Sequence, residues 1–208
     1  MRPMGPGIEA AMTMRSVRLL LWAAVLAAAL LAGWFLVLAP RFQQTVEDNI
    51  GRGDYSLVAT DGGTFSEAAL RGQPSAVFFG FTHCPDVCPT TLGDIGVWQE
   101  ELGADAGKVR FWFVTVDPER DTVDILRDYI SWTPGVTGAS GPRAEVDKAI
   151  SAFKVFAQKV PLDGGGYNVD HTAYVMLFDG RGRFDRIISY QEPTESAVRK
   201  LRELIARG

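Results

Sequence analysis

The feature that most constrains this chain is a run of 21 residues, Leu19 to Ala39, without a charged or strongly polar side chain. As an α-helix rising about 1.5 Å per residue, the run spans about 31 Å, which matches the hydrocarbon core of a bilayer. Trp22 and Trp34 lie towards its ends, where indole rings favour the membrane interface. A cleaved signal peptide is the alternative, but its apolar region is normally about 7–15 residues, and Pro40 disfavours cleavage after Ala39. We therefore predict an uncleaved membrane anchor over residues 19–39.

Positive charges flank this run unevenly. Arg2, Arg15 and Arg18 precede it, whereas acidic neighbours dilute the arginines that follow it. Because positively charged flanks stay in the cytoplasm, residues 1–18 are predicted to form a cytoplasmic tail and the rest of the chain to be exported. The absence of a long Arg/Ser-rich presequence favours a bacterial inner membrane, with the soluble domain facing the periplasm, over a mitochondrial location.

Residues 40–54 are interpreted as a linker and residues 55–208 as one exported domain, which is long enough for a single hydrophobic core. The chain has 21 Lys and Arg against 25 Asp and Glu, a net charge of −4. Binding to a phosphate backbone needs clustered cations, so this balance argues against a nucleic-acid partner. The two cysteines are too few for a disulfide scaffold.

The exported domain alternates strand-like and helix-like patterns. The apolar run 76–81 predicts a buried strand, and four apolar side chains follow it at helical spacing: Leu92, Ile95, Trp98 and Leu102. Further strands are predicted over 109–116, 173–178 and 184–189, and further helices over 122–130, 143–153 and 194–206. Asp121 is the predicted cap of the helix over 122–130.

A strand-helix-strand start and a strand-strand-helix finish is the thioredoxin-like order. We therefore predict an α/β, thioredoxin-like fold preceded by a single transmembrane helix. Open α/β sheets place their sites at the carboxyl ends of the strands, and the loop after the first apolar strand reaches that edge.

That loop, Phe81-Thr-His-Cys84-Pro-Asp-Val-Cys88-Pro89, holds both cysteines of the chain. Since Cys84 and Cys88 are four residues apart, one helical turn presents both sulfurs on one side. Pro89 disfavours the α conformation at the residue before it, so we predict that the helix begins at Pro89 with Cys88 as its cap. A helix N-terminus favours the thiolate, which is both the nucleophile and the metal-binding form. A structural disulfide is the alternative, although so short a loop gains little stability from one.

The residue types favour copper over zinc. Thioredoxin-type exchange usually uses two residues between its cysteines, and this loop has three. A structural zinc site needs four ligands, and the exported domain offers few sulfur or imidazole groups: Cys84, Cys88, His83, His171 and Met176. Two thiolates with one imidazole suit Cu(I) and also tolerate Cu(II). The pattern leaves two candidate imidazoles, His83 and His171. The side chain of His83 diverges from that of Cys84 in extended backbone, which disfavours it as a ligand. His171 precedes the strand over 173–178, and in a thioredoxin-like sheet the start of that strand lies against the cysteine loop.

Four motifs give the chain a resemblance to a known family: Gly80-Phe-Thr-His-Cys-Pro-Asp-Val-Cys-Pro89, Val116-Asp-Pro-Glu-Arg-Asp-Thr122, Val169-Asp-His-Thr172 and Gly180-Arg-Gly-Arg-Phe184. Over nearly all of residues 55–206, the chain resembles the SCO/SenC family of copper-binding cytochrome oxidase assembly proteins. The resemblance implies that Cys84 and Cys88 supply the copper thiolates and that His171 supplies the copper-binding imidazole, whereas His83 is not a ligand. It also implies delivery of copper, received from an upstream donor, to the dinuclear centre in subunit II of cytochrome c oxidase.

Two functions from different classes follow. The first is a membrane-tethered copper chaperone that binds the ion through Cys84, Cys88 and His171. The second is a thiol-disulfide oxidoreductase in which Cys84 and Cys88 are catalytic and reduce the cysteines of the subunit II centre. A peroxidase is a more distant third, because Val87-Cys-Pro-Thr90 is similar to the peroxiredoxin loop but Pro85 stands where those enzymes place Thr or Ser.

Acidic residues follow the strand over 109–116. Asp117, Glu119 and Asp121 are able to attract a cation, but Asp-Pro turns and helix caps explain most of the pattern, so we leave them outside the metal site.

Three features near His171 have their own interpretations. Asp170 is a candidate to orient the imidazole, although adjacent side chains diverge in extended backbone. Met176 lies within an apolar strand and is expected in the core. Gly164 to Gly166 lack the Lys of a phosphate loop and are expected to form a mobile loop leading to His171.

Overall fold

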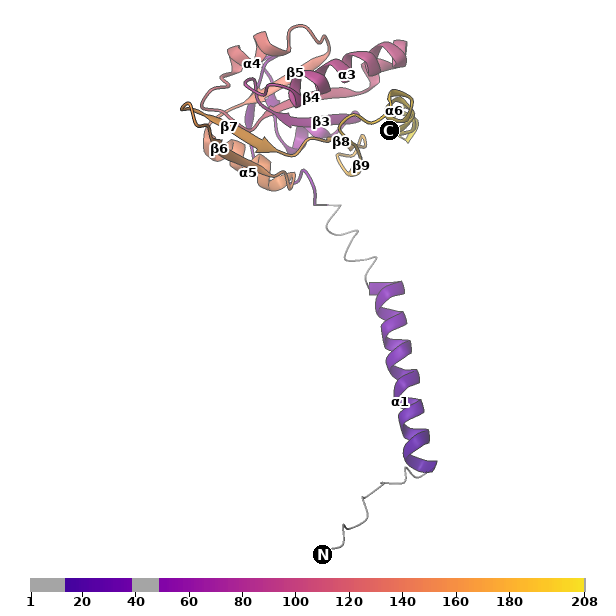
Figure 1. The fold of residues 1–208 in the computed structure, drawn as a ribbon. Helices are drawn as coiled ribbons and strands as arrows, with labels where there is room; N and C mark the ends of the chain where they lie inside the picture. Colours follow the sequence, from indigo (N-terminus) through magenta and orange to yellow (C-terminus); the bar gives the residue numbers. More distant parts are fainter. Residues whose placement is uncertain (1–13, 39–48, 208) are drawn as a thin grey trace, which may run out of the picture. The chain divides into compact units, whose positions relative to one another are not determined.

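The computed structural model describes residues 14–38 and 49–207. The chain forms two compact units, Met1–Val46 and Glu47–Gly208. In the first unit, helix α1, Met14–Gly33, continues into a π-helical turn, Trp34–Leu38 (Figure 1). Residues Met14–Leu36 are long and apolar enough to cross a membrane, with a mean hydropathy of 2.3. The predicted tail before residue 14, and the part of the predicted anchor and linker within 39–48, lie outside the described residues.

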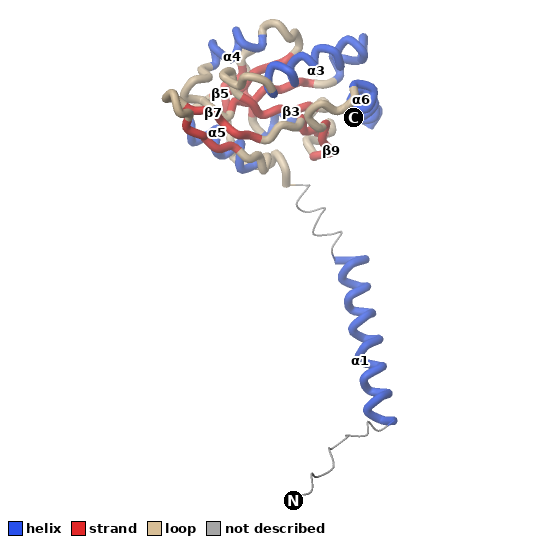
Figure 2. Tube along the Cα trace, in the orientation of Figure 1, coloured by secondary structure: helices blue, strands red, loops and turns tan. Residues whose placement is uncertain are grey.

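The second unit contains a seven-stranded mixed sheet with the strand order β2-β1-β5-β4-β3-β8-β9. Figure 2 shows the strands of this unit in red among its helices. Its strands are β1 Leu57–Ala59, β2 Thr64–Phe65, β3 Ser75–Gly80, β4 Arg110–Thr115, β5 Val136–Ser140, β8 Val175–Phe178 and β9 Phe184–Ile188. The central strands β3, β4 and β5 are parallel, and β8 and β9 extend the sheet in antiparallel pairs. A separate antiparallel hairpin consists of β6 Ala157–Pro161 and β7 Tyr167–His171.

Helices cover both faces of this sheet. They are α3 Val87–Leu102, α4 Val123–Ile130, α5 Arg143–Ala152 and α6 Thr194–Arg207, with 3₁₀ helices over Glu67–Leu70 and Gly103–Lys108. Figure 1 shows α3 and α4 on the opposite side of the sheet from α5. The predicted strands and helices are present in the predicted order, with α3 in the place that the helical spacing indicated, but β1, β2 and β5 were not predicted, and β5 lies between α4 and α5.

The core follows from the sequence of β3. Every residue of β3 is buried, as expected for a central parallel strand covered on both faces. Side chains alternate between the faces of a strand, so Phe78 packs on Phe113 on one side and Phe79 packs on Phe153, after α5, on the other. The two aromatic layers fix β3, and with it the position of the loop that follows.

The predicted start of the cysteine helix was wrong. Helix α3 begins at Val87 with Asp86 as its N-cap, so Cys88 lies within the first turn. The first N–H groups of a helix have no acceptor inside the helix. Proline lacks a backbone N–H, so Pro89 is tolerated in the first turn. The N–H of Cys88 instead points at the Cys84 sulfur, with 3.3 Å between N and Sγ.

The predicted cap of α4 was also wrong. Thr122 is the N-cap, and its hydroxyl accepts a hydrogen bond from the Ile125 N–H at 3.3 Å. The Asp121 side chain turns inward, where it accepts hydrogen bonds from the Thr82 and Thr115 hydroxyls, each at 2.6 Å. A buried carboxylate needs such donors more than a helix end needs a second cap.

The glycines expected in a mobile loop form the turn of the β6–β7 hairpin. Gly165 and Gly166 have φ angles of 88° and 80°, a left-handed conformation that favours glycine. Hydrogen bonds close the turn, from the Gly165 N–H to the Leu162 carbonyl and from the Leu162 N–H to the Gly166 carbonyl. The hairpin was not predicted because β6 is mostly exposed and shows no alternation of apolar residues.

Candidate metal centre

Strand register brings distant parts of the chain to one edge of the sheet. In the antiparallel pair of β3 and β8, Phe78 lies opposite Val175. The residues after β3 therefore lie beside the residues before β8. Strand β4 runs parallel to β3, with Thr115 opposite Gly80, so the loop after β4 reaches the same edge. The cysteine loop, the loop over 116–122 and the segment that carries His171 meet there.

Three of the predicted site residues come together at this edge. Among the residues that the structure describes, Cys84, Cys88 and His171 form one group whose sulfur and ring-nitrogen atoms lie within 4.8 Å of one another. Cys88 Sγ is 3.5 Å from His171 Nε2. Cys88 is buried, Cys84 and His171 are half-buried, and both cysteines are free thiols. His83 is exposed, hydrogen-bonds to Thr82 and stands outside the group.

The two thiols have opposite electrostatic surroundings. The Cys88 side chain, together with the N–H groups of Asp86 and Cys88, stabilises the Cys84 thiolate against the opposing effect of burial and lowers the pKa of Cys84 to about 4. Burial, reinforced by the neighbouring Cys84, raises the pKa of the Cys88 thiol. The pair therefore holds its first negative charge on the more accessible sulfur and retains a proton on the buried one.

A backbone carbonyl orients the His171 ring. Its Nδ1 lies 2.8 Å from the Thr172 carbonyl oxygen, which only accepts, so Nδ1 carries the proton and Nε2 faces Cys88 with a free electron pair. The rings of Phe81 and Phe78 pack edge-on against the imidazole, with centroids 5.6 and 6.0 Å away. Asp170, the candidate from the sequence, is exposed, and the Thr172 carbonyl takes the orienting role instead.

Gly80 is a site residue that the sequence reasoning missed. A Cβ at this position would lie 2.8 Å from Cys88 Sγ and 2.8 Å from Phe113 Cζ. Only glycine lets the buried sulfur approach the end of β3 so closely. The available signal was a glycine that ends a strand of bulky apolar residues just before the cysteine loop.

The remaining candidates have structural roles, as interpreted from the sequence. Asp117 and Glu119 pair with arginines, and Asp121 accepts hydrogen bonds from threonine hydroxyls. Met176 is 1% exposed and belongs to the core.

The donor set suits a soft or borderline metal ion. Three donors bound to one ion at about 2.0–2.3 Å in trigonal or tetrahedral geometry lie roughly 3.3–4.0 Å apart, so a group within 4.8 Å closes with shifts of about 1 Å or less. Two thiols and one imidazole match the ligands that copper prefers. A cavity of about 260 Å³ lies beside the group, lined by the cysteine loop and β7. The arrangement therefore offers three ligands and a route for exchange.

Comparisons with known proteins agree with this geometry. The SCO1/SenC family profile matches residues 43–206. The structure of Bradyrhizobium japonicum ScoI with copper bound is 41% identical in sequence, covers 74% of this chain and 99% of that chain, and has a TM-score of 0.69. The mitochondrial SCO2 protein of Saccharomyces cerevisiae is 34% identical over 158 residues, which are 74% of this chain and 52% of that protein.

A SCO2-like protein of Rickettsia prowazekii is 36% identical over 135 residues, which are 64% of this chain and 66% of that protein. The chain spans about half the length of the yeast relative and just under two thirds of the rickettsial one. The likeness to the ScoI structure confirms the predicted α/β, thioredoxin-like fold. One apolar N-terminal helix, a candidate for a membrane span, precedes this fold in the chain. Since the family match covers most of its length, the chain belongs to the SCO1/SenC family.

Proposed function

We propose that this protein is a membrane-anchored copper chaperone that assists assembly of the dinuclear copper centre in subunit II of cytochrome c oxidase. Cys84, Cys88 and His171 are the proposed ligands. The convergence of their donor atoms within 4.8 Å carries the proposal. The copper-bound structures of Bradyrhizobium japonicum ScoI and yeast Sco1, 41% and 31% identical to this chain, support it.

The residues of the site suit a cargo that is held and then released. The Cys84 thiolate and the His171 Nε2 electron pair are ready to bind a cation, whereas Cys88 first gives up its proton. Uptake of copper is therefore coupled to proton release. Three ligands from this chain, beside a cavity of about 260 Å³, leave room for a ligand from the partner to reach the ion before the first ligands let go.

The proposed arrangement in the cell follows from the N-terminal helix. Residues 19–39 span a bacterial inner membrane, residues 1–18 stay in the cytoplasm, and residues 40–54 link the span to a periplasmic domain over 55–208. The apolar helix and the arginines before it support this orientation. Copper from an upstream donor would reach the site in the periplasm.

The surroundings of the thiols also favour a second candidate function, a thiol-disulfide oxidoreductase. The Cys84 thiolate would attack a disulfide of subunit II, form a mixed disulfide and release one partner thiolate. Cys88, after losing its proton, would attack Cys84 Sγ and release the second. The net reaction oxidises two thiols of this chain to one disulfide and reduces one partner disulfide to two thiols. The lowered pKa of Cys84, about 4, favours that first attack.

An anaerobic Cu(I) titration of the reduced full-length chain in detergent micelles tests the proposal. We expect one copper per chain, loss of tight binding in Cys84→Ser and Cys88→Ser, and a weakening of about tenfold or more in His171→Ala. His83→Ala is the matched control, because it removes the other imidazole of the chain and should leave the affinity unchanged.

The same variants separate the two functions. Suppose that His171→Ala binds copper as tightly as the wild type and still reduces the disulfide of a peptide with the subunit II copper motif. His171 would then not be a copper ligand, and the result would favour the oxidoreductase over the chaperone. If the variant reduces the peptide but binds copper weakly, His171 serves the metal and the chaperone is supported.

A further inference from the structure

The loop between β4 and α4, residues 116–122, contacts both halves of the candidate metal centre. One of its aspartates serves the cysteine loop: Asp121 Oδ1 accepts a hydrogen bond from the Thr82 hydroxyl at 2.6 Å, and Oδ2 accepts one from the Thr82 N–H at 3.1 Å. Thr82 lies two residues before Cys84. The loop therefore fixes the cysteine side of the site directly.

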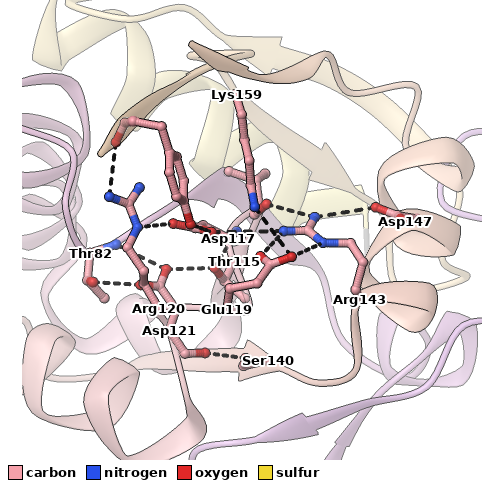
Figure 3. Close-up of polar contacts among 12 residues, drawn as sticks. Thr82, Thr115, Asp117, Glu119, Arg120, Asp121, Ser140, Arg143, Asp147 and Lys159 are labelled. Atoms are coloured by element: carbon pink, nitrogen blue, oxygen red, sulfur yellow. Dashed lines mark hydrogen bonds and ion pairs between the residues drawn. The ribbon is translucent and has the colours of Figure 1, made fainter. Parts of the chain in front are cut away.

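The other aspartate serves the hairpin that carries His171. Asp117 is completely buried, and its carboxylate accepts a hydrogen bond from the Tyr167 hydroxyl at 2.8 Å and pairs with Arg120 Nε. Figure 3 shows Asp117 between Arg120 and Arg143, whose Nη2 is 3.9 Å away. Tyr167 begins β7, and His171 ends it. A carboxylate without exposure needs these partners, so the contact holds the hairpin against the loop.

Arg120 links Asp117 to the imidazole by two routes. Its Nη1 donates to the Tyr167 carbonyl at 3.0 Å, and its guanidinium lies over the Tyr167 ring, 3.9 Å from the centroid. The same guanidinium lies 5.6 Å from the centroid of the Phe81 ring, and Phe81 packs edge-on against His171. One side chain therefore contacts the start of the strand that carries His171 and the ring that packs on its imidazole.

We propose that Arg120, held by Asp117, is a positioning residue that sets the His171 imidazole at bonding distance from the two sulfurs. The inference rests on the proposed copper site and adds to it a residue that touches none of the three ligands through its own polar atoms. Arg120 acts through the β6–β7 hairpin and through Phe81.

A second pair in the neighbouring helix supplies a matched control. Arg127 pairs with Asp124 at the same three-residue spacing as Arg120 with Asp117. Arg127 also makes one tertiary contact, from Nε to the Thr60 carbonyl at 3.0 Å. Among the described contacts, this pair reaches neither the hairpin nor the cysteine loop, so Arg127→Gln removes the same charge without touching the site.

A double-mutant cycle on Cu(I) affinity tests the proposal, using the full-length chain in micelles and competition with a chromophoric chelator. Arg120→Gln should weaken binding about tenfold, as expected for a residue that orients a ligand, and by no more than His171→Ala does. In the His171→Ala background the same change should have less than about a twofold effect, because the imidazole through which Arg120 acts is gone. Arg127→Gln should have no effect in either background.

Equal losses in both backgrounds, or an affinity of Arg120→Gln equal to that of the wild type, would overturn the proposal. Should Arg120→Gln lack a cooperative thermal transition, Tyr167→Phe takes its place in the cycle. That variant removes only the hydroxyl that bonds to Asp117 and keeps the ring under Arg120. It should weaken binding about threefold or more in the wild-type background alone.

A measurement without copper keeps this inference separate from the proposed function. The chain contains two histidines, so imidazole ¹⁵N spectra of the histidine-labelled, reduced protein give one site signal and one reference signal from exposed His83. In the wild type and Arg127→Gln, His171 should show a fixed tautomer protonated at Nδ1. In Arg120→Gln its signals should move towards tautomer averages, with His83 unchanged. An unchanged His171 in Arg120→Gln would contradict positioning, whereas a wild type that binds no copper would contradict the proposed function.

Discussion

Gly80 is the point of closest approach between the end of β3 and the buried sulfur of Cys88. Gly80→Ala adds a Cβ at 2.8 Å from Cys88 Sγ and Phe113 Cζ, and both atoms belong to fully buried side chains. We expect a loss of about 1–3 kcal/mol in the free energy of unfolding, as is typical of overpacking, together with weaker copper binding. Urea denaturation and copper titration measure the two effects.

Gly93→Ala is the matched control for Gly80→Ala. Gly93 lies within α3, and a Cβ there meets no atom within 4 Å. The substitution should therefore stabilise the protein, by about 0.5–1 kcal/mol. If Gly80→Ala had the stability and the copper affinity of the wild type, the close approach of Cys88 to Gly80 would matter for neither property.

The asymmetry of the two thiols predicts how the metal-free protein reacts with iodoacetamide. Hydrogen bonding, first from Cys88, lowers the pKa of Cys84 to about 4, so its thiolate is the main form above about pH 5. The alkylation rate of Cys84 should stay nearly constant between about pH 6 and 8, whereas an ordinary thiol gains about tenfold per pH unit there. Mass spectrometry of quenched time points measures the rate at each cysteine.

Variants of Cys88 and Cys84 provide the controls for this pH profile. Cys88→Ala removes the largest stabilising contact of the Cys84 thiolate, so the rise in reactivity should move to higher pH. In Cys84→Ser, the buried Cys88 should remain unreactive across the range because burial raises its pKa. A tenfold gain per pH unit at Cys84 in the wild type would refute the assignment of the first negative charge to that sulfur.

At the level of elements, the N-terminus of α4 is stabilised by the hydroxyl of its N-cap, Thr122. The Thr122 side chain accepts from the Ile125 N–H, one of the helix donors without a partner inside the helix. Thr122→Ala should lower the free energy of unfolding by about 1 kcal/mol, and Thr122→Ser, which keeps the hydroxyl, should lose much less. Thermal unfolding of the wild type and both variants measures the difference. If Thr122→Ala were as stable as the wild type, the hydroxyl cap would contribute nothing to stability.

The contact between the loop over 116–122 and α5 predicts a pH dependence of stability. The hydrogen bond from the Arg143 guanidinium lowers the pKa of Glu119 to about 2. Because the pKa is lower in the folded state than in the unfolded chain, ionised Glu119 stabilises the fold above the ordinary Glu pKa of about 4.3. That contribution is lost as the pH falls through about 2, and it is below about 1 kcal/mol because the pair is half exposed.

Glu119→Gln isolates this contribution. The variant should be less stable than the wild type above about pH 4.5, and the difference should vanish towards about pH 2. Urea denaturation at several pH values measures it, with Glu101→Gln as the control for removing an exposed carboxylate elsewhere. A constant difference at every pH would show that the ionised pair is not its cause.

At the level of the whole molecule, the apolar helix α1 is expected to hold the protein in a membrane. Leu26 lies near the middle of the candidate span Met14–Leu36. Leu26→Arg places a charge there at a cost of about 2.5–3.5 kcal/mol, so the protein should shift from the membrane to the soluble fraction, while Leu26→Phe should stay bound. Carbonate extraction followed by sedimentation measures the partition. A membrane fraction of Leu26→Arg equal to that of the wild type would argue against a single-span anchor.

Local patterns in the sequence were enough to locate most of the elements. The apolar run of β3, the helical spacing of Leu92 to Leu102 in α3 and the hairpin turn between β8 and β9 each reflect burial of one segment against its neighbours. The same local patterns identified both sulfurs of the site, because both lie in the short segment after β3, although Cys84 precedes α3 and only Cys88 lies in its first turn. The patterns missed β1, β2 and β5, which are two to five residues long, and they missed the β6–β7 hairpin, in which β6 is mostly exposed and shows no alternation of apolar residues.

The third member of the site depended on tertiary structure. Cys88 and His171 are 83 residues apart in the chain, and the antiparallel register of β3 with β8 sets the distance between them. The same holds for Asp117 and Asp121, whose partners come from β7 and from the cysteine loop. Periodicity along a chain determines which side chains are buried, whereas the pairing of strands determines which buried and polar groups meet. Local patterns therefore predicted most of the elements and the two thiols, and the family resemblance pointed to His171, whereas strand pairing in the fold brings that imidazole to the sulfurs.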